Sequence, residues 1–263
     1  MKNYFYYKNK KKVEPVDDVE LNKLAKKKLA QILKKDKDKI PSYFLENWSD
    51  VALYNPKGDV EKARSIILEA SEGAYDLTNK LNDLTGKEWI KFTCSWFIFN
   101  ALHSDLKEEK EISPDIKDHP ATYSPTMIEG FINFFTKEGQ TVLDPFCGIG
   151  STLVAAKRTN RVGYGIELNK KYYDLILKRV PEFKENIFLD SSENISSIEL
   201  PEIDFCISSP PYWDVLNRST HDFSKKRSSK GLDVNYSDKD DDLGNIEDYD
   251  EFCDRLAGIY KDL

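Results

Sequence analysis

The chain has 263 residues, 40% of them hydrophobic and 32% charged, with a formal net charge of −7. This composition supports a hydrophobic core and excludes disorder throughout, and the four scattered cysteines exclude a disulfide scaffold. The longest apolar stretch, residues 94–102, is far shorter than the roughly 20 residues of a membrane span, and no signal-peptide pattern opens the chain, so we expect a cytoplasmic protein with no membrane partner.

Positive charge is concentrated at the N-terminus. Residues 1–40 contain 13 lysines against 6 acidic residues, a net charge of +7, which leaves −14 for residues 41–263. A basic segment of this kind either contacts nucleic acid phosphates or is simply a solvated face. The sequence leaves both alternatives open.

Residues 1–115 are expected to form a mostly helical N-terminal region. Within it, residues 19–35 repeat apolar side chains near every 3.6 positions, which predicts an amphipathic helix with lysines on its outer face. Asp59 has the residue type of an N-cap, and the apolar residues after it predict a second helix that extends toward Leu84. The aromatic-rich residues 88–102 are expected to pack against the domain that follows.

Residues 116–263 are expected to form one α/β domain. Ser124 and Pro125 have the residue types of an N-cap and a first helical position, and Gly139 closes that helix. Aliphatic segments then alternate with helical ones, which predicts a parallel sheet with helices on both faces. The expected strands are 141–143, 163–166, 187–189 and 203–207, the expected helices after residue 150 are 152–158, 169–180 and 246–263, and residues 217–242 are expected to form a long mobile loop.

A glycine-containing segment, Asp144-Pro-Phe-Cys-Gly-Ile-Gly-Ser-Thr152, follows the first of these strands and opens the next helix. Gly148 and Gly150 allow the backbone to turn tightly and approach a ligand. Glu167 ends the second strand, where a carboxylate can accept hydrogen bonds from both hydroxyls of a ribose. Neither the third glycine of the nicotinamide fingerprint nor the Gly-Lys-Ser/Thr of a P-loop is present, so we expect an adenosine-type cofactor without a pyrophosphate.

Asp190 directly follows the third strand. An acid at this point can accept a hydrogen bond from an adenine amino group, and it can equally cap the turn that begins at Ser191. Both interpretations remain open.

The segment Ser208-Ser-Pro-Pro-Tyr-Trp213 directly follows the fourth strand. Two consecutive prolines cannot continue a central strand, so they force a rigid, extended exit from it. The carbonyls of Ser209 and Pro210 can then accept the hydrogens of an exocyclic amine, while Tyr212 stacks on the base that carries it. Trp213 either flanks that base or packs at the hinge.

Together, DPFCGIGST and SSPPYW resemble the DNA amino-methyltransferases, which transfer a methyl group from S-adenosylmethionine to cytosine N4 or adenine N6. Over residues 118–215, the resemblance implies a Rossmann-like methyltransferase sheet, S-adenosylmethionine as cofactor and DNA as partner. The segment from His119 to Ser124 is similar to the one that lines the cofactor's methionine end. Ser209, at the first position of the tetrapeptide, is similar to the cytosine N4 members. The resemblance assigns cofactor binding to Asp144, Phe146, Gly148, Gly150 and Glu167, and places the catalytic corner at Ser209, Pro210, Pro211 and Tyr212; Asp190 is added as the acid for the adenine.

The cysteines agree with amine chemistry. Methylation at cytosine C5 needs a nucleophilic thiol, usually in a Pro-Cys pair, and no cysteine here follows a proline. The four cysteines also form no ligand pair, so a metal site is not expected.

The resemblance is incomplete in one respect. Sheets of that family have seven strands, whereas only four are expected here, so we expect a second chain or a further C-terminal part to complete the sheet and the chain alone to be nearly inactive. Two other functions remain open: an RNA exocyclic-amine methyltransferase, and a non-catalytic fragment or subunit of a split methyltransferase.

Overall fold

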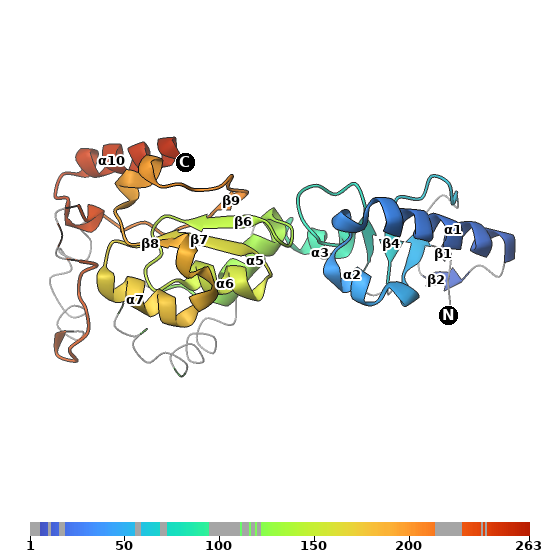
Figure 1. Ribbon diagram of the computed structural model, residues 1–263, viewed down its shortest axis with the longest axis horizontal. Helices are drawn as coiled ribbons and strands as arrows, with labels where there is room; N and C mark the ends of the chain where they lie inside the picture. The colour runs from blue at the N-terminus through green and yellow to red at the C-terminus, as the bar shows by residue number, and fades with distance from the viewer. Residues whose placement is uncertain are drawn as a thin grey trace. The chain divides into compact units, whose positions relative to one another are not determined.

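The computed structural model describes residues 6–9, 12–15, 19–55, 59–68, 73–94, 111, 116, 119, 122–213, 228–237, 239 and 241–263. The chain divides into two compact units, residues 1–98 with 133–138 and residues 99–132 with 139–263 (Figure 1). A boundary near residue 115 stays a prediction, because most residues between 95 and 118 lie outside the described part. Within that part, no helix has the length and apolar character to cross a membrane.

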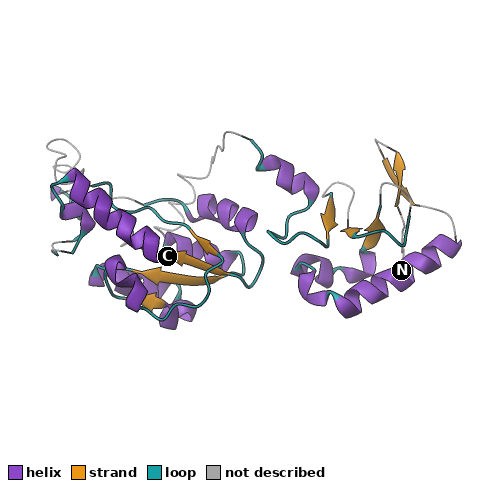
Figure 2. Cartoon of the chain, turned by 90° about the horizontal axis from the view of Figure 1, so that it is seen from above, coloured by secondary structure: helices purple, strands orange, loops and turns teal. Residues whose placement is uncertain are grey.

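The N-terminal unit contains a five-stranded sheet with the strand order β2-β1-β3-β4-β5. β1 and β3 are parallel, and the other neighbouring pairs are antiparallel. Figure 2 shows these strands and the helices that accompany them. The strands are β1 (Tyr6–Asn9), β2 (Lys12–Pro15), β3 (Ala52–Tyr54), β4 (Ser65–Ile67) and β5 (Ala74–Asp76).

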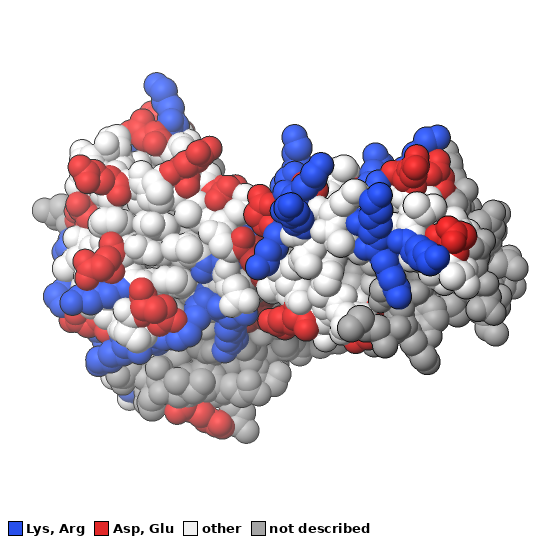
Figure 3. Space-filling view, turned by 45° about the vertical axis from the view of Figure 1, so that its right-hand side comes forward, with Lys and Arg blue, Asp and Glu red and all other residues white. Residues whose placement is uncertain are grey.

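Helix α1 (Val19–Lys35) has the bounds that the sequence predicts. Its buried residues are Ala25, Leu29 and Ile32, which share one core cluster with Leu53 of β3 and Tyr75 of β5. Lys23, Lys27 and Lys34 occupy the opposite side of the helix and face away from the core, whereas Lys28 is half-buried and donates to the Glu61 carbonyl. Figure 3 shows lysines and arginines projecting from the surface of this unit.

The predicted helix from Asp59 toward Leu84 is wrong, because this segment forms β4 and β5 instead. Asp59 does cap a turn, since its Oδ1 accepts the backbone N–H groups of Glu61 and Lys62 at 3.0 and 3.2 Å. The turn does not propagate because Ile66 pairs with Tyr75 across β4 and β5, and both side chains are fully buried. Cross-strand pairing of a β-branched and an aromatic residue favours the sheet, and the region mixes helices with strands rather than being mostly helical.

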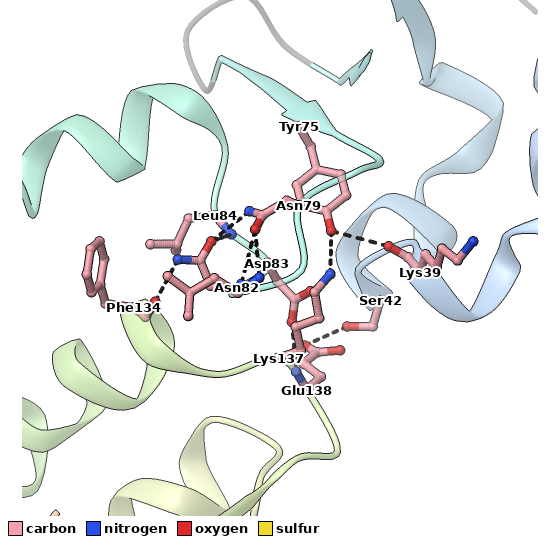
Figure 4. A network of polar contacts seen from close by, with 11 residues as sticks. Lys39, Ser42, Tyr75, Asn79, Asn82, Asp83, Leu84, Phe134, Lys137 and Glu138 are labelled. Carbon is pink, nitrogen blue, oxygen red and sulfur yellow. Dashed lines mark hydrogen bonds and ion pairs between the residues drawn. The ribbon is translucent and has the colours of Figure 1, made fainter. Parts of the chain in front are cut away.

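Residues 134–138 are joined to the rest of the N-terminal unit by polar contacts (Figure 4). Asn82 is fully buried and its amide donates to the carbonyl of Phe134 at 2.6 Å. Lys137 Nζ donates to the hydroxyl of Tyr75 at 2.8 Å, and the backbone N–H of Glu138 donates to Asp83 Oδ2 at 2.7 Å. Burial lowers the pKa of Lys137. The other helices of the unit are α2 (Ser42–Glu46) and α3 (Gly86–Lys91), the latter opened by a capping box.

The C-terminal unit contains a parallel sheet with the strand order β8-β7-β6-β9. The chain's first strand in this sheet, β6, lies between the second and the fourth. The chain therefore proceeds outward through β7 and β8 on one side of β6 and then crosses to β9 on the other side. Ligands of open α/β sheets bind beside such a switch point, outside the carboxyl ends of the strands. The strands are β6 (Thr141–Asp144), β7 (Val162–Ile166), β8 (Ile187–Phe188) and β9 (Phe205–Cys206), which confirms the four predicted strands within a few residues.

Helices cover both faces of this sheet (Figure 1). Val142 of β6 packs with residues of α5 and α6, whereas its neighbour Leu143 joins a cluster on the other face that includes Ile166 and Ile195. This alternation is the period of a strand. The helices are α5 (Pro125–Phe135), α6 (Ser151–Arg158), α7 (Lys170–Arg179) and α10 (Tyr249–Asp262), which confirms the helices predicted here.

Candidate active site

An open cavity lies beside the switch point of the parallel sheet. Its lining includes the loop after β6, the end of β7 and the segment after β9. Five of the ten sequence-predicted site residues line it, namely Phe146, Gly148, Glu167, Ser209 and Pro211. The other five, Asp144, Gly150, Asp190, Pro210 and Tyr212, do not.

Asp144 lies behind the cavity, where it holds the surrounding segments together. It is fully buried at the end of β6. Oδ2 accepts hydrogen bonds from the Tyr123 and Thr152 hydroxyls, and Oδ1 accepts from the Ser208 hydroxyl and the Phe146 backbone N–H. Burial raises the pKa of this carboxyl, while the four donors oppose that shift. Asp144 thus fixes the segment before α5, the start of α6 and the exit of β9 around one carboxylate.

The loop after β6 requires glycine at two positions. Gly148 and Gly150 have φ values of +54° and +80°, in the left-handed region that favours glycine. A Cβ on Gly148 would also lie 2.9 Å from Nε2 of His119, and one on Gly150 would lie 3.0 Å from Cγ2 of Ile176. His119 packs edge-on against Tyr172, with ring centroids 4.6 Å apart. The loop therefore follows a path that no residue with a side chain could take without strain.

Cys147 packs against β7 and has a structural role. A Cβ on Gly165 would lie 2.1 Å from the Cys147 sulfur, so the thiol fills the space that glycine leaves. Sγ donates to the Asp144 carbonyl at 3.1 Å, and burial raises the pKa of the thiol well above its ordinary value. A thiol in this state is a poor nucleophile.

Glu167 faces the cavity from the end of β7. Its Oε2 accepts the Gly148 backbone N–H, and its Oε1 accepts the Asn169 backbone N–H, each at 2.7 Å. The residue is 8% exposed, and burial raises the pKa of its carboxyl to about 8. Each carboxylate oxygen keeps a second lone pair, so the group can still accept two hydroxyl donors.

Ser151 supplies a polar atom that needs a ligand. Its Oγ is buried in the cavity lining and has no hydrogen-bond partner among the described residues. Buried hydroxyls are normally paired, so this atom marks a position where a bound polar group would contact the start of α6. Together with the glycine loop and the Glu167 carboxyl, it fits the carboxylate, ribose and amino groups of an adenosine-type cofactor.

A segment after the sequence-predicted corner also lines the cavity. Tyr236 lies 5.8 Å from the ring of His119, and its backbone carbonyl accepts the Asn169 amide at 2.7 Å. Asp242 is 3% exposed, accepts hydrogen bonds from Gly244 N and Ser237 Oγ at 2.8 Å each, and has a pKa that burial raises. Asp233 binds Lys171 and the Tyr172 hydroxyl. The described part of the predicted loop thus packs against α7, while residues 217–227, 238 and 240 lie outside the described residues.

Acidic side chains line the cavity, although Glu193 is ion-paired with Arg255 and burial raises the pKa of both Glu167 and Asp242. Glu167, Glu193, Asp241 and Asp242 all belong to its lining, and the described residues contribute no lysine or arginine to that lining. Such a surface favours a cationic ligand and disfavours phosphate groups.

Two side chains of the predicted catalytic corner contact each other. The hydroxyls of Ser209 and Tyr212 lie 2.8 Å apart, and the Tyr212 ring is 56% exposed. The ring therefore offers a face on which a base can stack. Trp213 has a positive φ of +52° and packs edge-on against Tyr249 of α10, with the ring centroids 5.1 Å apart. This contact matches the alternative in which Trp213 packs at the hinge.

Asp190 makes local contacts. Its Oδ1 accepts the Ser191 backbone N–H at 2.7 Å and the Asn194 amide at 2.8 Å. These bonds belong to the turn-capping alternative, and Asp190 lies outside the cavity lining, although Ser191 and Ser192 belong to it.

Four residues of this site were not among the predicted site residues: Tyr123, Ser151, Ser208 and Asp242. Tyr123, Ser151 and Ser208 lie within or beside the predicted motifs, but their individual roles depend on contacts between segments far apart in the chain. Asp242 was assigned to the loop because charged residues surround it. Asp242 is the N-cap of the 3-10 turn Leu243–Asn245, and the Asp-Leu-Gly sequence of this cap was the local signal.

Comparison with known proteins agrees with the family that the sequence resembles, and the match of the family model includes the loop after β6. The model of the DNA methylase family matches residues 2–178. The type II methyltransferase M.HindIII of Haemophilus influenzae is 36% identical over 91 residues, which cover 35% of this chain and 29% of the relative. M2.DpnII of Streptococcus pneumoniae is 42% identical over 106 residues, which cover 40% and 35%.

Among solved structures, the M1.HpyAVI complex with SAM is 38% identical, with a TM-score of 0.24, and the match covers 24% of this chain and 31% of that chain. TrmN of Thermus thermophilus is 20% identical, with a TM-score of 0.33, over 38% of this chain and 31% of that chain. The chain spans about a quarter to a third of the length of the curated relatives it matches.

Proposed function

We propose that this chain, which belongs to the DNA methylase family of N6 and N4 amino-methyltransferases, transfers a methyl group to an exocyclic amino group of a DNA base. S-adenosylmethionine is the cofactor of this family. We place the enzyme in the cytoplasm, with DNA as its substrate and cytosine N4 favoured over adenine N6.

The observation that carries the proposal is one shared cavity. The loop after β6, which contains Gly148, and the corner after β9, which contains Ser209, line the same space at the switch point. β6 and β9 are hydrogen-bonded neighbours, so their carboxyl ends present the two motifs side by side. A cofactor in the loop and an amine at the corner would therefore meet in this cavity.

The charge of the cavity supports the cofactor. S-adenosylmethionine carries a sulfonium and an ammonium group, and four acidic side chains line the cavity. Glu167 is the proposed partner of the ribose hydroxyls, and Ser151 Oγ is the proposed partner of a polar group at the methionine end. A pyrophosphate cofactor would be repelled by the same surface. Asp144 is proposed to act as a positioning residue, since its acceptors are already used by the chain.

The corner supplies the assistance that the amine needs. The lone pair of an exocyclic amine is delocalised into the base ring, so an unassisted reaction is slow. When bound, the cofactor supplies an electrophilic methyl group. Ser209 Oγ and the Pro210 carbonyl accept the amine hydrogens, which favours a tetrahedral nitrogen and stabilises its growing positive charge. As the nitrogen–methyl bond would form and the methyl–sulfur bond would break, a neutral thioether would be left and the nitrogen would lose one proton to water. Tyr212 would hold the base by stacking.

Cytosine N4 is the favoured target because Ser209 stands at the first position of the tetrapeptide, as in the N4 members that the motif resembles.

A second inference concerns the edge of the sheet. β9 is an edge strand of only two residues within the described sheet. We infer that a further segment or a second chain pairs with it, since an open edge is normally covered.

The test of the proposed function is the identity of the methylated base. The complete enzyme, meaning this chain with any segment or partner that its locus encodes, is incubated with duplex DNA and methyl-labelled cofactor, and the DNA is digested to nucleosides. We expect label in N4-methylcytosine. Label in N6-methyladenine alone would overturn the choice of base, and label only at cytosine C5 would overturn the assignment of amine chemistry.

A further inference from the structure

The lysines of α1 form an ordered cationic face. Lys23, Lys27 and Lys34 follow one another at intervals of four and seven residues, which places them on one side of the helix. The buried residues Ala25 and Ile32 lie on the opposite side. At 1.5 Å per residue, the three lysines extend over about 16 Å. Because α1 is packed against the core, the three lysines are held in a line on the surface, unlike those of a flexible basic tail.

Most of these charges are not used within the chain. Among the described residues, Lys26, Lys27, Lys34 and Lys35 form no ion pair or hydrogen bond, while Lys23 pairs only with the exposed Glu20 at 3.3 Å. In the C-terminal unit, the basic side chains Lys157, Arg158, Lys170, Lys171 and Arg255 are each paired with an acidic side chain. Its exposed lysines Lys178, Lys184 and Lys261 form no ion pair among the described residues, but they do not follow one another along a single helix face.

The charge distribution adds a second reason. Residues 1–40 carry a net charge of +7 and the remainder of the chain carries −14. The proposed substrate, duplex DNA, bears one phosphate per about 3.4 Å along each strand. An acidic protein that acts on such a polyanion needs a basic surface to offset repulsion. The face of α1 is one such basic surface in the part of the chain that the structure describes.

We propose that the outer face of α1, defined by Lys23, Lys27 and Lys34 with Lys26 and Lys35 on its flanks, binds the phosphate backbone of the DNA substrate. The inference rests on the proposed function and concerns affinity rather than sequence choice, because phosphate contacts position a protein without reading bases. The three lysines of the row, Lys23, Lys27 and Lys34, can each contact one phosphate, so the row accounts for about three phosphate contacts.

Salt dependence of DNA binding tests this directly, because each phosphate contact contributes about 0.9 to the slope of log affinity against log salt concentration. The complete enzyme is titrated with a fluorescein-labelled duplex between 50 and 300 mM salt, on the order of the range in which such slopes are measured. The variant K26Q/K27Q/K34Q is compared with K178Q/K184Q/K261Q, which removes three exposed lysines from the C-terminal unit. Circular dichroism and cofactor affinity check that both variants are folded.

We expect the slope to decrease by about 2 to 3 in the α1 variant and by less than about 1 in the control. An unchanged slope in the α1 variant, or an equal decrease in both variants, would overturn the inference while methyl transfer by the wild type leaves the proposed function standing. A wild type that neither binds nor methylates DNA would overturn both. A variant that loses affinity for poly-glutamate competitor but keeps the DNA slope would point to an acidic protein as partner and also overturn the inference.

Discussion

The backbone N–H of Gly148 donates to Oε2 of Glu167 over 2.7 Å, which ties the loop after β6 to the carboxylate at the end of β7. The backbone N–H of Asn169 occupies the other carboxylate oxygen in the same way. Two backbone donors therefore fix the direction of Glu167. The acid that is proposed to bind the ribose is positioned by the loop that is proposed to bind the methionine part.

The first prediction concerns Glu167. Glu167→Ala removes the acceptor for the ribose and also leaves Gly148 N without its partner, so cofactor affinity should fall by about 1 to 3 kcal/mol. Glu167→Gln keeps one acceptor and should lose less. Calorimetric titration with S-adenosylmethionine gives both values, and an Ala variant with the wild-type affinity would remove Glu167 from the site.

The second prediction concerns pH. Burial raises the pKa of Glu167 to about 8 in the free protein. Hydroxyl donors and a cationic ligand favour the ionised carboxylate, so binding should lower this pKa and release a proton. Affinity should therefore increase as pH rises toward about 8 and level off above it.

Calorimetry at pH 7 in buffers with different ionisation enthalpies measures this proton release. The variant E167Q serves as the control, because it subtracts proton exchange by the amino group of the cofactor itself. Equal proton release by the wild type and E167Q would show that Glu167 does not titrate on binding.

The third prediction concerns Asp144. Asp144→Asn replaces one accepting oxygen with a donor in a fully buried position where four donors converge, so the free energy of unfolding should fall by about 2 kcal/mol or more. Asp190→Asn is the matched control, since Asp190 accepts only local bonds at a partly exposed site. Urea unfolding followed by circular dichroism distinguishes the two, and comparable losses would show that the network around Asp144 carries no special weight.

The fourth prediction concerns the contact between Gly165 and Cys147. Gly165→Ala places a Cβ about where the thiol lies and should destabilise the fold by about 1 to 3 kcal/mol. Cys147→Ala removes the sulfur and should restore most of that loss in the double variant. Unfolding of the four proteins forms a double-mutant cycle, and additive effects would contradict the proposed packing.

Much of the C-terminal unit could be predicted from sequence because its helices and strands have local sequence signals. Helix caps such as Asn169, the aliphatic runs of β6 and β7, and the proline pair after β9 each act within a few residues. The loop after β6 and the corner after β9 could be placed at one end of a parallel sheet for the same reason. The spatial meeting of Gly148 and Ser209 in one cavity then follows from strand order.

The N-terminal sheet could not be predicted in the same way. β3, β4 and β5 have three residues each, too few for the period of a strand to stand out from that of a helix. The pairing of Ile66 with Tyr75 stabilises the sheet. This contact joins two strands and therefore leaves no local pattern in the sequence. Tyr123, Ser208 and Asp242 were missed for a related reason, since each acts on a partner far away in the chain or lies in a polar segment.

The last prediction concerns the corner. Ser209→Ala removes an acceptor that matters most as the amine gains charge, so it should slow methyl transfer while cofactor affinity stays at the wild-type value. Tyr212→Ala should lose stacking worth about 1 to 3 kcal/mol and weaken productive DNA binding, again without effect on the cofactor.

The most direct measurement of the central claim is single-turnover methyl transfer by the complete enzyme and these two variants, with cofactor affinity measured on the same samples. We expect Ser209→Ala and Tyr212→Ala both to be slower than the wild type and to bind the cofactor equally well. Methyl transfer at the wild-type rate by both variants would contradict the central claim and place the catalytic corner elsewhere.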